Sequence, residues 1–245
     1  MKRAASLPWY NFASTRPTLD RVWREVRAQL TGDGYSDLPQ QLDHKRTFRE
    51  LAAGGNFLLS QCCGLDLLQP YSDEIVPVGA PVITTLDASN GYYYSYIVTR
   101  TGADFTDLLE PLRVVINDPA SHSGSTAIKV WLATNHGGAC AFETTGSHAR
   151  SVHALQSAKA DVAAIDAFSW QFLDTHGLQV LARSAAAPAP PFVTGKHSDI
   201  PGERLLTALD VAFTRHGNAM GISAVVPVEL CTYRDMFDQA RRYNR

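Results

Sequence analysis

Short runs of β-prone residues alternate along the chain with stretches in which apolar residues recur at helical spacing. Residues 4–10 predict a strand that stops at Asn11. The apolar positions between residues 19 and 30 recur every three or four residues behind Pro17, and Gly32 supplies a C-terminal stop. The chain is therefore expected to begin with a strand and a crossover helix.

The same alternation continues through the rest of the chain. It predicts strands at 56–61, 92–100, 113–117, 139–143 and 161–166, and helices that begin at Gly64 or span 123–134, 147–158 and 167–176. A Pro- and Ala-rich stretch at 184–192 is expected to be an extended crossing segment, and helices follow at 200–213 and 233–243. This order is typical of an α/β protein with a mostly parallel sheet.

Composition narrows the class of protein and of partner. The 245 residues are 45% hydrophobic, enough for a large core in one or two domains. Lys and Arg number 22 against 24 Asp and Glu, so no basic excess is present to bind a nucleic acid backbone. No apolar run approaches the ~20 residues of a membrane span. We therefore expect neither a nucleic acid partner nor membrane insertion.

The start of the chain and its cysteines bear on the compartment. The segment that follows Met1 is too short and too polar for a signal sequence. A cytoplasmic location is expected for the chain as written, and a periplasmic one if a signal has been removed. The four cysteines show no C-x-x-C spacing, which favours a reduced compartment. The adjacent Cys62 and Cys63 are interpreted as small residues filling a turn, with a reactive pair as the alternative.

The sharpest local feature lies where the predicted strand 113–117 gives way to the next helix. Hydroxyl residues cluster there around Gly124, namely Ser121, Ser123, Ser125 and Thr126. Hydroxyl donors beside the free N–H groups and positive dipole end of a helix N-terminus form a site for an anion. The alternative is an ordinary Ser or Thr N-cap, for which a single hydroxyl suffices.

Two further segments carry candidate side chains. Gly146 turns the chain after a strand, and Ser147 and His148 open the next helix, either as a second binding edge or as a plain cap. Asp166 ends the buried strand 161–166, where α/β sheets present side chains to ligands. Its carboxylate is expected either to accept from a ligand or to cap the helix that follows.

The three segments together resemble a known family. Ser-x-Ser-Gly-Ser at 121–125, Thr-Gly-Ser-His at 145–148 and Ala-Asp-Val-Ala-Ala-Ile-Asp at 160–166 are similar in order to the phosphate-, phosphite- and phosphonate-binding family of type II periplasmic binding proteins. The resemblance extends more loosely to the segment 7–10 and the Pro-rich stretch. It implies two α/β lobes, each with a mixed, mostly parallel sheet flanked by helices, joined by two crossing strands, with a ligand clamped between them.

On this resemblance lobe one comprises residues 1–91 and 185–245, and lobe two residues 92–184. The implied ligand is a small oxyanion such as phosphate, phosphite or a phosphonate, and an ABC permease is a further partner. The resemblance implies ten ligand-binding residues: Tyr10, Gln61, Cys62, Ser121, His122, Ser123, Gly124, Ser125, His148 and Asp166. Because His122 stands where the family usually has a small residue, we expect a narrower loop or one that titrates near neutral pH.

Other chemistries lack their motifs. The sequence has no Gly-x-Ser-x-Gly, no Walker A motif, no Gly-x-Gly-x-x-Gly and no His-Glu-x-x-His. No catalytic residue, cofactor or metal site is therefore predicted. The favoured function is a non-catalytic binding protein for a small oxyanion. The alternative is a cytosolic enzyme on the same fold, similar to menaquinone-pathway enzymes or thiamine-pyrimidine synthases, with a histidine or Asp166 as acid or base.

Overall fold

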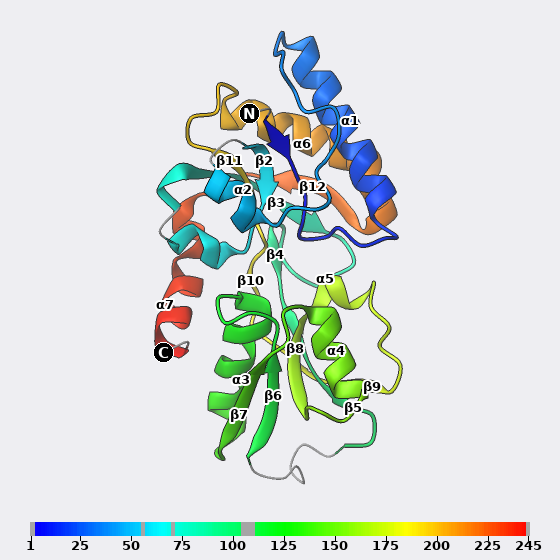
Figure 1. Ribbon diagram of the computed structural model, residues 1–245, viewed down its shortest axis with the longest axis vertical. Coiled ribbons are helices and arrows are strands. Elements are labelled where there is room, and N and C mark those ends of the chain that lie inside the picture. Colours follow the sequence, from blue (N-terminus) through cyan, green and yellow to red (C-terminus); the bar gives the residue numbers. More distant parts are fainter. Residues whose placement is uncertain (1–2, 55–56, 70–71, 104–110, 244–245) are drawn as a thin grey trace. The chain divides into compact units, whose positions relative to one another are not determined.

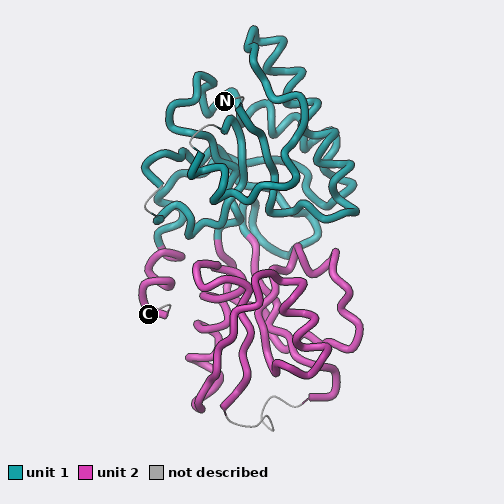
Figure 2. The backbone as a smooth tube through the Cα atoms, in the orientation of Figure 1, with its two compact units in different colours: residues 1–92, 188–234 teal, residues 93–187, 235–245 magenta. Residues whose placement is uncertain are grey.

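The chain folds into two compact units (Figures 1 and 2). The computed structural model describes residues 3–54, 57–69, 72–103 and 111–243. Unit 1 comprises Met1–Tyr92 and Pro188–Arg234, and unit 2 comprises Tyr93–Ala187 and Asp235–Arg245. Each unit therefore draws on both halves of the sequence.

A five-stranded mixed sheet with strand order β1-β2-β11-β3-β12 forms the centre of unit 1. Its strands are β1 (Ala4–Ala5), β2 (Phe57–Gln61), β3 (Ile75–Ile83), β11 (Phe192–Gly195) and β12 (Ile222–Val226). Its helices are α1 (Arg16–Gly32), α2 (Phe48–Gly54) and α6 (Gly202–His216). The β1–β2 pair is parallel, whereas the three remaining pairs are antiparallel.

Helices α1 and α6 follow from their apolar stripes. Pro17 stands in the first turn of α1, and Val22, Trp23 and Val26 are among the residues buried along one face. The two long helices contact each other extensively, and α6 also packs against β3 and β12 of the sheet, so the apolar stripes are buried in these contacts. Figure 1 shows them side by side.

Unit 2 has its own five-stranded mixed sheet, with strand order β7-β6-β8-β5-β9. Its strands are β5 (Ser95–Arg100), β6 (Leu112–Ile116), β7 (Cys140–Thr144), β8 (Val162–Asp166) and β9 (Leu178–Arg183). Its helices are α3 (Ala127–Asn135), α4 (His148–Gln156), α5 (Ala167–Trp170) and α7 (Arg234–Tyr243). Strands β7, β6 and β8 are parallel neighbours, and β5 pairs antiparallel with β8 and β9.

The two faces of the unit 2 sheet carry separate cores because successive side chains of a strand point to opposite faces. Ile128 and Leu132 of α3 pack with one set of strand residues, and Val152 and Leu155 of α4 pack with the alternate set. Strand β8 is buried along its whole length. The carboxyl ends of the parallel strands β6 and β8 thus lie under the N-termini of the helices that cover them.

Two short strands, β4 (Tyr92–Tyr93) and β10 (Ala187–Pro188), pair with each other where the chain passes from one unit to the other. Strand β10 falls within the Pro- and Ala-rich stretch 184–192 that was expected to be an extended crossing segment. The sequence placed all of 185–245 in lobe one, whereas residues 235–245 group with unit 2. These residues include most of α7, in which Met236 and Phe237 are buried.

Several predicted elements differ from the observed ones. The strand predicted over 4–10 is limited to Ala4–Ala5, since Pro8 has no N–H for a ladder. The helix predicted over 167–176 ends at Trp170, and Leu173 packs against the core from the segment that follows. Of the strand predicted at 56–61, Asn56 lies outside the described residues.

Strands β3, β9 and β12 were not predicted from the sequence, and β11 lies at the end of the segment predicted to be an extended crossing. These four strands form four antiparallel pairs, in sheets that the sequence predicted as mostly parallel. Strand β3 contains Pro77 and Pro81, which weaken a strand pattern. The mixed character of both sheets agrees with the prediction, but neither sheet has an excess of parallel pairs: three of the four pairs in unit 1 are antiparallel, and unit 2 has two pairs of each kind.

Candidate anion-binding site

The hydroxyl-rich segment forms the connection from β6 to α3 in unit 2. Residues His122–Thr126 make a single π-helical turn that leads into α3. Ser121 has extended backbone angles and caps this turn, because its Oγ accepts a hydrogen bond of 3.2 Å from the Gly124 N–H. Turns of this kind are rare in proteins, and many of those that occur lie at functional sites. The hydroxyls therefore lie at a helix N-terminus, where N–H groups and the dipole favour an anion.

Gly124 is required by a close approach of Asn117 to the turn. A Cβ atom at position 124 would lie 2.0 Å from Asn117 Oδ1, well inside van der Waals contact. Asn117 itself follows β6, and its Oδ1 accepts a hydrogen bond of 2.8 Å from the Asp118 N–H. The absence of a side chain at 124 thus lets the strand end and the turn pack against each other.

His148 joins the hydroxyl cluster from α4. Ser147 caps this helix by accepting a 3.2 Å hydrogen bond from the Arg150 N–H, which places His148 at the first helical position. The Nε2 atom of His148 is 3.0 Å from Ser123 Oγ, and Ser123 Oγ is 3.4 Å from Ser121 Oγ. Two predicted segments, 25 residues apart, therefore meet in one cluster.

Ser125 differs from the neighbouring serines. Its side chain is fully buried, and its Oγ has no hydrogen-bond partner among the residues that the structure describes. A buried hydroxyl without a partner is unfavourable, because the group loses its hydrogen bonds to water and gains none in return. The turn therefore holds a donor that an oxyanion can satisfy.

Both histidines of the cluster are neutral at pH 7. Burial lowers the pKa of His148 to about 4, and the backbone of Ala164 only partly offsets this. Burial also lowers the pKa of His122 to about 4, and its hydrogen bond with the Gln239 side chain opposes the shift. The expectation that the loop titrates near neutral pH is therefore wrong for His122, because the imidazole is almost completely desolvated.

Three residues of this cluster were not predicted as site residues. Asn117 Nδ2 lies 3.4 Å from His148 Nε2, Tyr93 OH lies 3.3 Å from His122 Nδ1, and Gln239 contacts His122. The position of Asn117 at the end of a predicted strand was a signal for it. Tyr93 and Gln239 reach His122 from β4 and α7, so only the tertiary structure reveals them.

Asp166 serves as a helix cap. Its side chain is fully buried, and Oδ1 accepts a hydrogen bond of 2.8 Å from the Ser169 N–H at the start of α5. Capping was one of the two roles expected from the sequence. A contact with a ligand stays a prediction.

The remaining predicted residues belong to unit 1. Gln61 ends β2 and donates from Nε2 to the Pro190 carbonyl at 3.2 Å, and the next residue, Cys62, donates its N–H to Pro191 at 3.1 Å. Burial, with Asp66 and Cys63 adding to it, raises the pKa of the Cys62 thiol well above its ordinary value. Tyr10 was expected at the end of the first strand but lies in a turn after it, where its carbonyl accepts from Thr15 Oγ1.

Across residues 3–54, 57–69, 72–103 and 111–243, no three His, Cys, Asp or Glu side chains gather in a way that could hold a metal ion. Within the same ranges, no helix has both the length and the apolar character needed to cross a membrane.

Comparison with known families identifies the class of protein. A model of the family described as ABC transporter, phosphonate, periplasmic substrate-binding protein matches residues 72–226, more than half of the chain. The chain therefore belongs to this family of periplasmic substrate-binding proteins. The resemblance predicted from the serine-rich motif is confirmed.

Solved structures with the same fold agree with this assignment. A Prochlorococcus marinus PhnD1 structure in complex with methylphosphonate has a TM-score of 0.72 at 14% identity, over 99% of this chain and 98% of that one. A binding protein component of an ABC phosphonate transporter from Pseudomonas aeruginosa has a TM-score of 0.69 at 14% identity, over 100% and 90%. XAC2383 from Xanthomonas citri, bound to ATP, has a TM-score of 0.70 at 12% identity, over 98% and 96%.

These identities establish the fold rather than the ligand. The predicted fold class, a two-lobed α/β protein of the periplasmic binding type with mixed sheets flanked by helices, is confirmed. No curated protein matches this sequence.

Proposed function

We propose that this substrate-binding protein binds a small tetrahedral oxyanion of the phosphate, phosphite or phosphonate class at the turn 121–126. The observation that carries the proposal is Ser125 Oγ, a fully buried hydroxyl without a partner among the described residues, at the N-terminus of a helix. An anion oxygen bound there would accept its hydrogen bond. The phosphonate family and the methylphosphonate complex of the Prochlorococcus protein support this class of ligand.

The chemistry of the turn suits an oxyanion that is bound without a cationic side chain. Residues 117–126 contain no Lys or Arg. The charge is instead balanced by the helix dipole, backbone N–H groups and hydroxyls, which are strong donors in a dry site. Neutral His148 holds the Ser123 hydroxyl in place through a hydrogen bond of 3.0 Å between His148 Nε2 and Ser123 Oγ. Ser121, His122 and Gly124 shape the same turn, and we include them in the proposed site.

We also propose that the protein binds and releases its ligand unchanged. The hydrogen bond between Ser123 Oγ and His148 Nε2 resembles a catalytic pair. A general base works best when its pKa lies near the working pH, and burial lowers the pKa of His148 to about 4. A histidine of this kind is a poor base at pH 7, which favours the binding role over the enzyme alternative.

Membership in this family also supports a partner. We propose that the liganded protein delivers its anion to an ABC transporter permease, since the family is described as the periplasmic substrate-binding protein of such a transporter. For unit 1, Tyr10, Gln61 and Cys62 remain proposed ligand contacts, as does Asp166 in unit 2.

Isothermal titration calorimetry with methylphosphonate, phosphite and phosphate tests the proposed site. We expect at least one of these anions to bind the parent protein and Ser125→Ala to weaken that anion about tenfold or more, because a hydrogen bond to a charged group is lost. The matched control is Ser157→Ala, an exposed serine of the same unit whose Oγ donates to the His153 carbonyl at 2.7 Å.

The control variant should bind as the parent does. If Ser125→Ala binds every one of the three anions with parental affinity, the site is wrong. If none of them binds to the parent protein, the proposed ligand class is wrong. Recovery of chemically altered ligand after incubation would support the enzyme alternative.

A further inference from the structure

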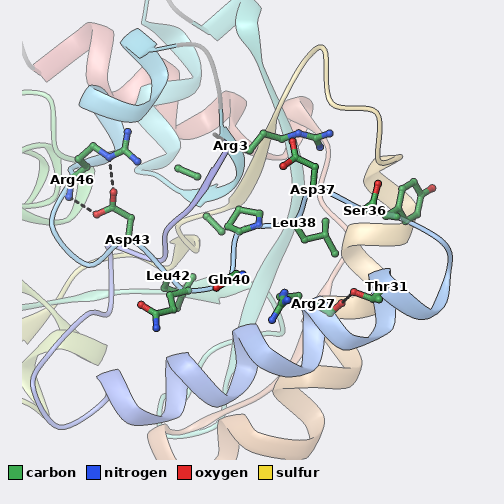
Figure 3. A pocket seen from close by; sticks show the side chains of 15 residues that line it. Arg3, Arg27, Thr31, Ser36, Asp37, Leu38, Gln40, Leu42, Asp43 and Arg46 are labelled. Atoms are coloured by element: carbon green, nitrogen blue, oxygen red, sulfur yellow. Dashed lines mark hydrogen bonds and ion pairs between the residues drawn. The ribbon is translucent and has the colours of Figure 1, made fainter. Parts of the chain in front are cut away.

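Unit 1 contains a pocket that the proposed anion site does not use. It has a volume of about 750 Å³ and lies between α1, β1 and the segment 35–46 (Figure 3). All of its lining residues belong to residues 3–46, so the pocket is formed within one unit. Pockets of about 300–1,000 Å³ are typical of small-molecule sites.

Two of the three arginines at this pocket have carboxylate partners. Arg3 donates to both carboxylate oxygens of Asp199, at 2.5 and 2.8 Å. Arg46 donates from Nε to Asp43 Oδ2 at 2.5 Å, and the Arg46 and Lys45 N–H groups bond to the other oxygen of the same carboxylate. These two guanidinium groups are therefore already neutralised by the protein.

Arg27 is different. It stands on the face of α1 that is turned toward the segment 35–46, and Figure 3 shows it beside Thr31, opposite Asp37 and Leu38. Its Nε is buried and has no hydrogen-bond partner among the described residues. A guanidinium N–H removed from water without an acceptor is strongly unfavourable, and carboxylate or phosphate oxygens are its best partners.

Asp37 also lines the pocket, where its carboxylate interacts electrostatically with the Arg3 guanidinium, and four further lining residues are polar without being charged. Thr31, Ser36, Gln40 and Gln41 supply hydroxyl and amide groups around the pocket. Such groups match the hydroxyls of a ligand, since each can donate and accept. An inorganic anion would leave most of this volume to water, whereas an organic anion would fill it.

We propose that this pocket binds a hydroxylated organic anion, whose carboxylate or phosphate group accepts the hydrogen bond from Arg27 Nε. The neutral polar side chains of the lining bind the hydroxyls of the same molecule. This ligand is distinct from the small oxyanion proposed for the turn 121–126, because the two sites share no residue.

The first experiment uses the full chain and two probes that differ in their anionic group, citrate and glucose 6-phosphate. Backbone amide chemical shifts of 15N-labelled protein are recorded during titration with each probe, and with glucose and inorganic phosphate as controls. We expect saturable shifts at residues 27–31 and 35–42 with at least one of the two probes and no comparable shifts there with glucose. Which probe binds more tightly identifies the carboxylate or the phosphate as the preferred group.

The second experiment compares Arg27→Gln with Arg24→Gln. Arg24 is exposed on the same helix and lies outside the pocket, so it is a matched loss of one charge. We expect Arg27→Gln to weaken the bound probe about tenfold or more, and Arg24→Gln to change its affinity less than twofold. Methylphosphonate affinity of both variants should remain parental, which separates this proposal from the anion site at 121–126.

Two results would overturn the proposal. One is the absence of saturable shifts at residues 27–31 and 35–42 of the parent protein with both probes at 10 mM concentration, roughly a hundred times a Kd of 0.1 mM. The other is an affinity of folded Arg27→Gln equal to that of Arg24→Gln. The shift mapping needs no variant, so it decides the question even if Arg27→Gln does not fold.

Discussion

At the scale of single residues, the candidate site depends on atoms that come very close together. Gly124 faces Asn117 Oδ1 at a distance that no side chain could tolerate, and Ser123 shares a hydrogen bond with His148. Ser125 keeps a hydroxyl free of partners among the described residues. The turn thus combines satisfied groups that hold its shape with one donor available for a ligand.

The close approach at Gly124 leads to a prediction on stability. Gly124→Ala places Cβ against Asn117, so the strand end or the turn must move, and we expect a loss of about 1–3 kcal/mol in the free energy of unfolding. Urea denaturation measures this loss. The control is Gly137→Ala, since a Cβ at Gly137 meets nothing within 4 Å.

A second substitution tests the cause. In the double variant Gly124→Ala with Asn117→Ala, the obstructing side chain is gone, and the combined loss should be smaller than the sum of the two single losses. Strict additivity of the two losses would show that Asn117 is not the obstacle.

At the scale of elements, helix N-termini position the candidate site residues of unit 2. Ser121, Ser147 and Asp166 cap the π-helical turn, α4 and α5 respectively. Each cap satisfies an N–H group that the helix itself leaves open. The sequence predicted helices after all three residues, but it overestimated the length of the one after Asp166, because short helices depend on tertiary packing.

The cap at Asp166 can be tested separately from binding. Asp166→Ala removes the acceptor of the Ser169 N–H and should lower the free energy of unfolding by about 1–2 kcal/mol. Asp166→Asn keeps a side-chain oxygen and should retain most of the stability. Thermal or urea unfolding of the two variants provides the comparison, and equal stability of Asp166→Ala and the parent would contradict a capping role.

At the scale of the whole molecule, burial of two histidines couples stability to pH. The pKa values of His122 and His148 are lowered from 6.5 to about 4 by desolvation. Below pH 6.5 the unfolded chain therefore takes up protons that the folded chain does not, and stability falls as the pH drops toward 4. Between pH 7 and pH 5, each histidine accounts for a loss on the order of 2 kcal/mol.

Urea unfolding at pH 7 and pH 5 tests this coupling. The fall in unfolding free energy should be smaller in His148→Gln than in the parent, since glutamine does not titrate. The control is His153→Gln, a change at an exposed position of the same helix. Its unfolding free energy should fall between pH 7 and pH 5 by as much as that of the parent. A fall in His148→Gln as large as that in the parent would show that His148 is not held neutral in the folded protein.

The amino-acid sequence by itself determined the features that depend on local pattern. Helices α1 and α6 follow from apolar stripes, and the hydroxyl-rich turn follows from four hydroxyls and a glycine after a strand. The family follows from the order of the motifs and is confirmed by the match to residues 72–226.

Only the tertiary structure determined which residues from distant parts of the sequence are in contact. His148 meets Ser123, and Tyr93 and Gln239 meet His122, through chain segments that no local pattern relates. The antiparallel strands β11 and β12 entered the unit 1 sheet through long-range pairing, which sequence periodicity does not encode. The neutral state of the histidines and the unpartnered Nε of Arg27 likewise result from burial, because desolvation depends on every segment that packs around a group.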